Sequence, residues 1–203
     1  MAASQQITER SDLARVHRFV VKVGSSSLTM PDGSLNHAYL ARLVGLLAAR
    51  RARGHQVVLV TSGAIASGLQ PLRLPRRPTD LATQQAAAAV GQGLLIHTYT
   101  EAFAARGIGV GQVLLTADDL IRPQHYSNAR RTLLRQLELG VIPIVNENDA
   151  VATHEIRFGD NDRLAALTAN LVSAQVLLLL TDVEGLYTAP PSDPGSTLVS
   201  EVY

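Results

Sequence analysis

The sequence predicts an α/β domain, built on a mainly parallel sheet that helices cover on both faces. Short aliphatic runs recur along the chain, helical patterns separate them, and small polar residues follow them. The runs span residues 19–23, 57–60, 110–115, 141–145 and 176–180. They are apolar and rich in β-branched residues without alternation, which is typical of strands buried on both faces of a parallel sheet.

The segments between these runs carry the apolar spacing of helices. In residues 36–53 the leucines and valine at positions 40, 43, 44 and 47 fall at i, i+3, i+4 and i+7, and Gly54 follows as a stop. Further helices are expected over residues 81–106, 127–139 and 161–171. The regular alternation of strand and helix supports the α/β class.

Two proline-rich stretches, residues 69–80 and 188–197, predict surface loops. Gly91 and Gly93 interrupt the alanine-rich helix, and we expect close helix packing there rather than ligand contact. No repeat, long linker or shift in composition marks a second domain. We therefore expect a flexible segment over residues 1–17 and one domain over residues 18–203.

The composition excludes several classes of function. The 203 residues are 46% hydrophobic and 17% charged, which is enough apolar material for one core. Eighteen basic and 17 acidic residues leave a net charge of +1, so no broad field favours nucleic acid or an anionic membrane. The absence of cysteine excludes disulfides, a thiolate nucleophile and a cysteine zinc site, and fits a cytoplasmic protein. The longest unbroken aliphatic run, residues 176–180, is too short to span a membrane.

Small polar residues follow four of the predicted strands. Ligands of an open parallel sheet bind beyond the carboxyl ends of its strands, so these residues are candidates for a site. Lys22 is the only lysine among the 18 basic residues. A compact ammonium fits beside a phosphate where a planar guanidinium does not, and Gly24 and Ser25 offer backbone N–H groups to an anion. An ordinary polar turn is the alternative interpretation.

Residues 146–162 concentrate carboxylate and amide side chains. A solvated loop would explain them, and one residue before the helix at 161 is expected to be its N-cap. The alternation of oxygen ligands does not continue past Asp162, so the stretch is not a calcium loop. A carboxylate beside a lysine is the preferred interpretation.

Other nucleotide and hydrolase motifs are absent. The sequence contains no G-x-x-x-x-G-K-[ST], and its nearest approaches to G-x-G-x-x-G, at residues 91–93 and 107–109, lack the third glycine. Ser62 has neither the flanking glycine of a nucleophile elbow nor an evident histidine partner. These observations disfavour a Walker-type NTPase, a dinucleotide dehydrogenase and acyl transfer through Ser62.

Taken together, six segments resemble the glutamate 5-kinases of the amino acid kinase superfamily. They are residues 20–25, 60–66, 111–116, 145–149, 159–162 and 180–182. The resemblance implies a three-layer αβα sandwich. It also implies Mg²⁺- and ATP-dependent phosphorylation of the side-chain carboxylate of L-glutamate, giving γ-glutamyl phosphate for proline synthesis.

The same resemblance implies roles for individual residues. Lys22 and Asp162 are the expected catalytic pair, with Lys22 on the transferring phosphoryl group and Asp162 orienting it. The expected glutamate-binding residues are Ser62, Asp149 and Asn161. The expected nucleotide-binding residues are Lys22, Gly24, Ser25, Thr181 and Asp182, and no protein ligand for a metal is expected. Asp149 suits the substrate ammonium, while hydroxyl and amide groups suit its carboxylates.

Members of the family continue with a glycine-rich segment and a second lysine, so we expect this domain to be incomplete at its C-terminus. Whether residues 1–203 alone are active is left open. The expected partners are glutamate and ATP, with a homo-oligomer and feedback inhibition by proline, and without nucleic acid or membrane. Two alternatives remain: another amino acid kinase, such as an acetylglutamate kinase, and a non-catalytic glutamate-binding or oligomerisation module.

Overall fold

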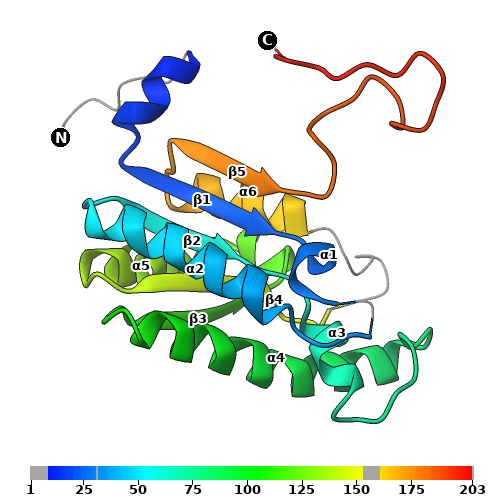
Figure 1. The fold of residues 1–203 in the computed structure, drawn as a ribbon. Helices are drawn as coiled ribbons and strands as arrows, with labels where there is room; N and C mark the ends of the chain where they lie inside the picture. The colour runs from blue at the N-terminus through cyan, green and yellow to red at the C-terminus, as the bar shows by residue number, and fades with distance from the viewer. Residues whose placement is uncertain (1–8, 31, 153–160, 203) are drawn as a thin grey trace.

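The computed structural model describes residues 9–30, 32–152 and 161–202, and within them the strands form one parallel sheet (Figure 1). The strands are β1 (Arg18–Val23), β2 (Gln56–Val60), β3 (Val110–Leu115), β4 (Ile142–Glu147) and β5 (Val176–Leu180). Their order across the sheet is β3-β4-β2-β1-β5, and every neighbouring pair is parallel. The predicted α/β class is confirmed.

Helices cover both faces of this sheet. The α-helices are α1 (Ser25–Leu28), α2 (His37–Ala52), α3 (Ala64–Leu69), α4 (Leu81–Ala104), α5 (Pro123–Glu138) and α6 (Asn161–Leu171). One buried cluster joins the sheet to α2 and α4, and a second joins it to α5 and α6, which gives the predicted three layers (Figure 1). Across the described ranges, no helix is both long and apolar enough to cross a bilayer.

The alternation of side chains along β1 decides where its lysine lies. Val21 and Val23 belong to the cluster under α2 and α4, whereas Val20 belongs to the cluster under α5 and α6. Successive side chains of a strand point to opposite faces, so Lys22 shares the face of Val20. A buried ammonium on this otherwise apolar face needs an anionic or hydrogen-bonding partner, and α6 is the helix that supplies one.

Most departures from the predicted elements are short helices. The helices α1 and α3 and the two 3₁₀-helices η1 (Arg10–Arg15) and η2 (Asp118–Leu120) were not predicted. Helix α5 begins at Pro123, before the predicted residue 127, because proline is favoured at the first helical position. Within the segment predicted to be flexible, η1 forms and the adjacent Val16 packs into the core. The loops predicted at residues 69–80 and 188–197 are irregular, except that α3 extends to Leu69.

Helices α3 and α4 cross in backbone contact. A Cβ on Gly91 would lie 1.9 Å from the carbonyl oxygen of Ala64, and one on Gly68 would lie 1.9 Å from that of Ala87. The close packing predicted for Gly91 is therefore confirmed. It is wrong for Gly93, where an added Cβ would meet nothing within 4 Å. The contact holds the start of α3, and with it the end of β2, against α4.

Gly91→Ala is expected to lower the free energy of unfolding by about 1–3 kcal/mol, the usual cost of overpacking. The new methyl group would meet backbone oxygen, which cannot move aside as a flexible side chain would. Gly93→Ala is the control, because Gly93 lies two residues further along α4 and is exposed. This variant should raise the free energy of unfolding by about 0.5–1 kcal/mol, through helix propensity. Urea denaturation measures both variants, and equal effects would contradict the close crossing.

Candidate active site

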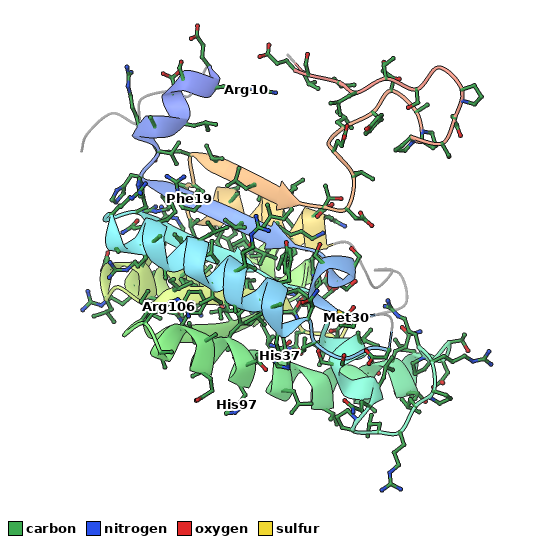
Figure 2. All side chains as sticks on the ribbon, viewed as in Figure 1. Arg10, Phe19, Met30, His37, His97 and Arg106 are labelled. Atoms are coloured by element: carbon green, nitrogen blue, oxygen red, sulfur yellow. The ribbon has the colours of Figure 1, made fainter. Side chains whose placement is uncertain are left out.

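A cavity of about 420 Å³ lies at the carboxyl ends of the strands, in the size range of small-molecule sites. Met30, labelled in Figure 2, follows α1 at this end of the molecule, and Arg106 marks the opposite end. The predicted site residues that line the cavity are Lys22, Gly24, Ser25, Ser62, Asp149, Asn161, Thr181 and Asp182. The fold therefore brings together residues that are up to 160 positions apart in the sequence, as expected for converging parallel strands.

Lys22 and Asp162 form an ion pair at the edge of this cavity. The Nζ of Lys22 lies 2.6 Å from Oδ1 of Asp162, which belongs to the first turn of α6. The lysine side chain is 11% exposed and the aspartate side chain 50% exposed. An ammonium has three donors, so a bond to one carboxylate oxygen leaves capacity for an anionic ligand. Asp162 thus holds the lysine by its charge while the lysine lines the cavity.

The turn after β1 lies directly beside the lysine ammonium. Gly24 is the N-cap of α1, and a Cβ there would stand 3.7 Å from Nζ of Lys22. A methyl group at this position would make ordinary van der Waals contact with the ammonium. The first N–H groups of a helix have no intrahelical acceptor, so the amides of Ser25 and Ser26 also suit an anion.

The side chain of Asn161 links the start of α6 to the ends of β2 and β4 by hydrogen bonds. Its Nδ2 donates to the carbonyl oxygen of Thr61 at 2.8 Å, to Oγ of Ser62 at 2.8 Å and to Oδ1 of Asn146 at 3.1 Å. Two hydrogens are shared among these three acceptors, so the protein itself uses the amide nitrogen. The Oδ1 of Asn161 is buried without a hydrogen-bond partner among the described residues. The part of the amide without a partner is therefore an acceptor, whereas a bond to a substrate carboxylate would need the donor that the protein already uses.

Asp149 and Arg77 give the cavity a second pair of opposite charges. Burial raises the pKa of the Asp149 carboxyl to about 6, and the positive charge of Arg77 acts in the opposite direction. Arg77 comes from the loop between α3 and α4 and lines the same cavity. The sequence predicts this segment only as a surface loop, so Arg77 was missed. The run of arginines was visible, but no pattern in it indicates which one faces the site.

The remaining predicted residues lie at the end of β5. Thr181 and Asp182 are both exposed, and Oγ1 of Thr181 donates to Oδ1 of Asp182 at 3.2 Å. The N-cap predicted for α6 lies outside the described residues, as do His154, Glu155, Arg157 and Asp160. Among the residues that the structure does describe, no group of three or more histidine, aspartate or glutamate side chains could hold a metal ion.

The description "Amino acid kinase family" applies to a family profile that matches residues 17–203. The chain belongs to the amino acid kinase family. The match covers the whole sheet and all the residues placed around the cavity, so the site described above lies within the family's own domain. The three-layer fold predicted for this amino acid kinase agrees with that membership.

Curated relatives of this amino acid kinase carry a more specific name. "Glutamate 5-kinase" from Thermobifida fusca is 60% identical over 193 residues, which are 95% of this chain and 50% of the relative. "Glutamate 5-kinase" from Streptomyces coelicolor is 59% identical, over 95% of this chain and 52% of the relative. The protein of the same name from Bifidobacterium adolescentis is 57% identical, over 100% of this chain and 54% of the relative. The resemblance to glutamate 5-kinases is confirmed, and the chain spans about half the length of these relatives.

Proposed function

We propose that this chain carries the glutamate site and part of the phosphate site of a glutamate 5-kinase. In this reaction an oxygen of the side-chain carboxylate of L-glutamate bonds to the γ-phosphorus of ATP, and ADP leaves. The observation that carries the proposal is that one cavity is lined both by Lys22, which pairs with Asp162, and by Asp149. Identities of 57–60% to glutamate 5-kinases support it, and they disfavour the acetylglutamate kinase and non-catalytic alternatives.

The chemical problem is to bring two anions together, so positioning and charge neutralisation dominate and no covalent nucleophile is needed. Lys22 places a fixed positive charge beside the transferring phosphoryl group, and Asp162 holds the ammonium in place. Backbone N–H groups of the turn after Gly24 bind phosphate oxygens. Mg²⁺ that arrives with the nucleotide neutralises further phosphate charge. Thr181 and Asp182 are proposed to contact the nucleotide.

The other part of the cavity matches the charges of an amino acid. Asp149 accepts the α-ammonium of glutamate, and Oδ1 of Asn161 is a second acceptor near the same cavity. Ser62 accepts a hydrogen bond from Asn161, so its own hydroxyl hydrogen is available to a substrate carboxylate. Arg77 supplies positive charge for a carboxylate that Lys22 does not bind. These assignments give each charged group of glutamate a partner.

The decisive experiment measures glutamate-dependent formation of ADP by the full-length protein and traps γ-glutamyl phosphate as its hydroxamate. N-acetylglutamate is the matched alternative substrate, because acetylation removes the cation that Asp149 would bind. We expect turnover with glutamate and little with N-acetylglutamate. Equal turnover of both would favour the acetylglutamate kinase alternative, and glutamate binding without turnover would favour a non-catalytic module. Proline inhibition, a homo-oligomer and a cytoplasmic location stay predictions.

Arg77→Gln is expected to move the acid limb of glutamate binding to higher pH. Arg77 lowers the pKa of Asp149, so its loss lets that pKa rise above about 6. Asp149 is then protonated, and unable to pair with an ammonium, over a wider range of pH. Calorimetric titration of glutamate between pH 5 and pH 8 measures the shift.

Arg76→Gln is the control for this prediction, because Arg76 is the neighbouring exposed residue and does not line the cavity. It should leave the pH profile where it is in the parent protein. An identical shift in both variants would mean that the net charge of the loop matters and that Arg77 has no specific place in the site.

A further inference from the structure

We propose that Gln92 of α4 is a positioning residue for the glutamate site, which acts through Asn146 on Asn161. The inference rests on the proposed function, because Asn161 is one of the proposed glutamate-binding residues. Gln92 is not among the residues that line the cavity, so any effect on a ligand must pass through other side chains.

The connection is a chain of buried side-chain amides. Nδ2 of Asn146 donates to Oε1 of Gln92 at 2.7 Å, and Nδ2 of Asn161 donates to Oδ1 of Asn146 at 3.1 Å. The three residues are 8%, 2% and 7% exposed in the order Gln92, Asn146 and Asn161. Buried polar groups of this kind are costly when a partner is lost, so the chain has a defined arrangement.

The direction of each hydrogen bond in this series of amides follows from the backbone carbonyl group of Thr61 at one end. The carbonyl oxygen of Thr61 can only accept, so Asn161 must present its NH₂ group there. Asn146 must then present its oxygen to Asn161 and its NH₂ group to α4. Because that NH₂ group needs an acceptor, position 92 must supply one, and the Oε1 of Gln92 does so.

The consequence for the ligand is the chemical character of Asn161. With the chain in this direction, Nδ2 of Asn161 is occupied and Oδ1 is the atom left without a protein partner in the described residues. If Asn146 turned over, its NH₂ group would face the NH₂ group of Asn161, and Asn161 would lose one of the bonds that hold its amide against Thr61. Gln92 thereby supports the orientation that Thr61 sets, in which Nδ2 of Asn161 is bonded within the protein and Oδ1 is the atom without a partner among the described residues.

The helix crossing explains how Gln92 reaches the site. Gly91, the preceding residue, packs against the carbonyl oxygen of Ala64 with no room for a Cβ. This contact brings α4 close to the ends of β2 and β4, where a glutamine side chain is long enough to reach Asn146. Two adjacent residues of α4 therefore have different roles: Gly91 permits the close crossing, and Gln92 bonds to Asn146.

Gln92→Met tests the proposal in the full-length protein, because methionine has a similar length and offers no strong acceptor. We expect the dissociation constant for glutamate, measured by calorimetry, to rise about 5- to 30-fold, as for a buried donor left without its partner. The dissociation constant for ATP should change less than about threefold, since bonds of this size are local. Gln92→Glu keeps an acceptor at the same reach and should restore much of the affinity for glutamate.

Gln136→Met is the matched control. Gln136 lies on α5, and its Oε1 is buried without a partner among the described residues, so the change removes no bond from the chain to the site. Gln136→Met should leave both dissociation constants unchanged. Equal losses of glutamate and ATP affinity in Gln92→Met, or the same loss in Gln136→Met, would show a general loosening of the fold and overturn the proposal.

A second readout does not depend on activity or on glutamate. The side-chain amide resonances of Asn161, observed by ¹⁵N NMR without substrate, should shift in Gln92→Met and return toward the parent positions in Gln92→Glu. Unmoved resonances in Gln92→Met would overturn the proposal. If the parent protein binds no glutamate, the proposed function fails, while the Asn161 resonances still decide whether Gln92 sets the orientation of that amide.

Discussion

Lys22→Arg is expected to lower the turnover of glutamate phosphorylation by about 10²-fold or more, the usual cost of displacing one preorganised charge from a reacting group. The lysine ammonium lies 2.6 Å from Asp162 in a place where its side chain is 11% exposed. A guanidinium is larger and planar, and its paired N–H groups match a carboxylate. Arginine would therefore stay on Asp162 and occupy the space intended for the phosphoryl group, although the net charge is unchanged.

Steady-state kinetics at saturating glutamate and ATP measure this effect, and thermal denaturation checks that the variant is folded. Lys22→Met removes the charge altogether and should be at least as slow. If Lys22→Arg turns over at nearly the parent rate, positive charge alone is sufficient, and the assignment of Lys22 to the transferring phosphoryl group is wrong.

Asp149→Asn is expected to weaken glutamate binding by about 10²-fold, within the range for removing one partner of a buried charge pair. The lost carboxylate is the proposed partner of the substrate ammonium, so ATP binding should change little. Calorimetric titration with each ligand separates the two effects. A loss confined to ATP would reverse the proposed assignment of the two parts of the cavity.

The same substitution should stabilise the protein without ligand above pH 6. Burial raises the pKa of Asp149 from 3.8 to about 6, so the folded state holds this proton more tightly than the unfolded state. Stability is therefore lost as pH rises through this interval, and the full penalty, on the order of 3 kcal/mol, is present above it. Asparagine carries no such penalty.

Denaturation at pH 4 and pH 8 checks the stability effect. The gain of Asp149→Asn over the parent protein should be present at pH 8 and should nearly vanish at pH 4. Asp182→Asn is the comparison, because Asp182 is an exposed carboxylate at the same edge of the sheet. A gain of equal size in Asp182→Asn would point to general charge repulsion in place of burial at Asp149.

The sheet was predictable because its strands are continuous apolar runs. The expected burial on both faces holds for β1, β2 and β4, whereas the edge strands β3 and β5 are only partly buried. Strands β3 (Val110–Leu115) and β5 (Val176–Leu180) have the predicted bounds. Strands β1 and β2 begin one residue earlier than predicted, and β4 begins one residue later and ends two residues later. Helices α1 and α3 were missed because four and six residues are too few to show helical periodicity. The convergence of polar residues at one edge followed from parallel pairing alone.

The finer composition of the site was not predictable, because it depends on tertiary contacts. Arg77 reaches the cavity from a loop, and Gln92 reaches Asn146 from a helix whose distance is set by two glycines. Asn161 was predicted as a ligand for glutamate from its position in a motif. That its nitrogen is already bonded within the protein depends on the ends of β2 and β4, which no local pattern encodes.

The two parts of the cavity differ in how readily they can be redesigned. Lys22 lies on a strand with neighbours on both sides, opposite Val60 of β2 and Leu179 of β5, so its backbone cannot shift without breaking two ladders. Arg77 lies on an irregular loop that tolerates changes in length and sequence. Under the proposed function, the carboxylate partner that Arg77 supplies is therefore the part of the site most open to change, and Lys22 is the least. Libraries of variants for new acceptor carboxylates should concentrate their diversity on that loop.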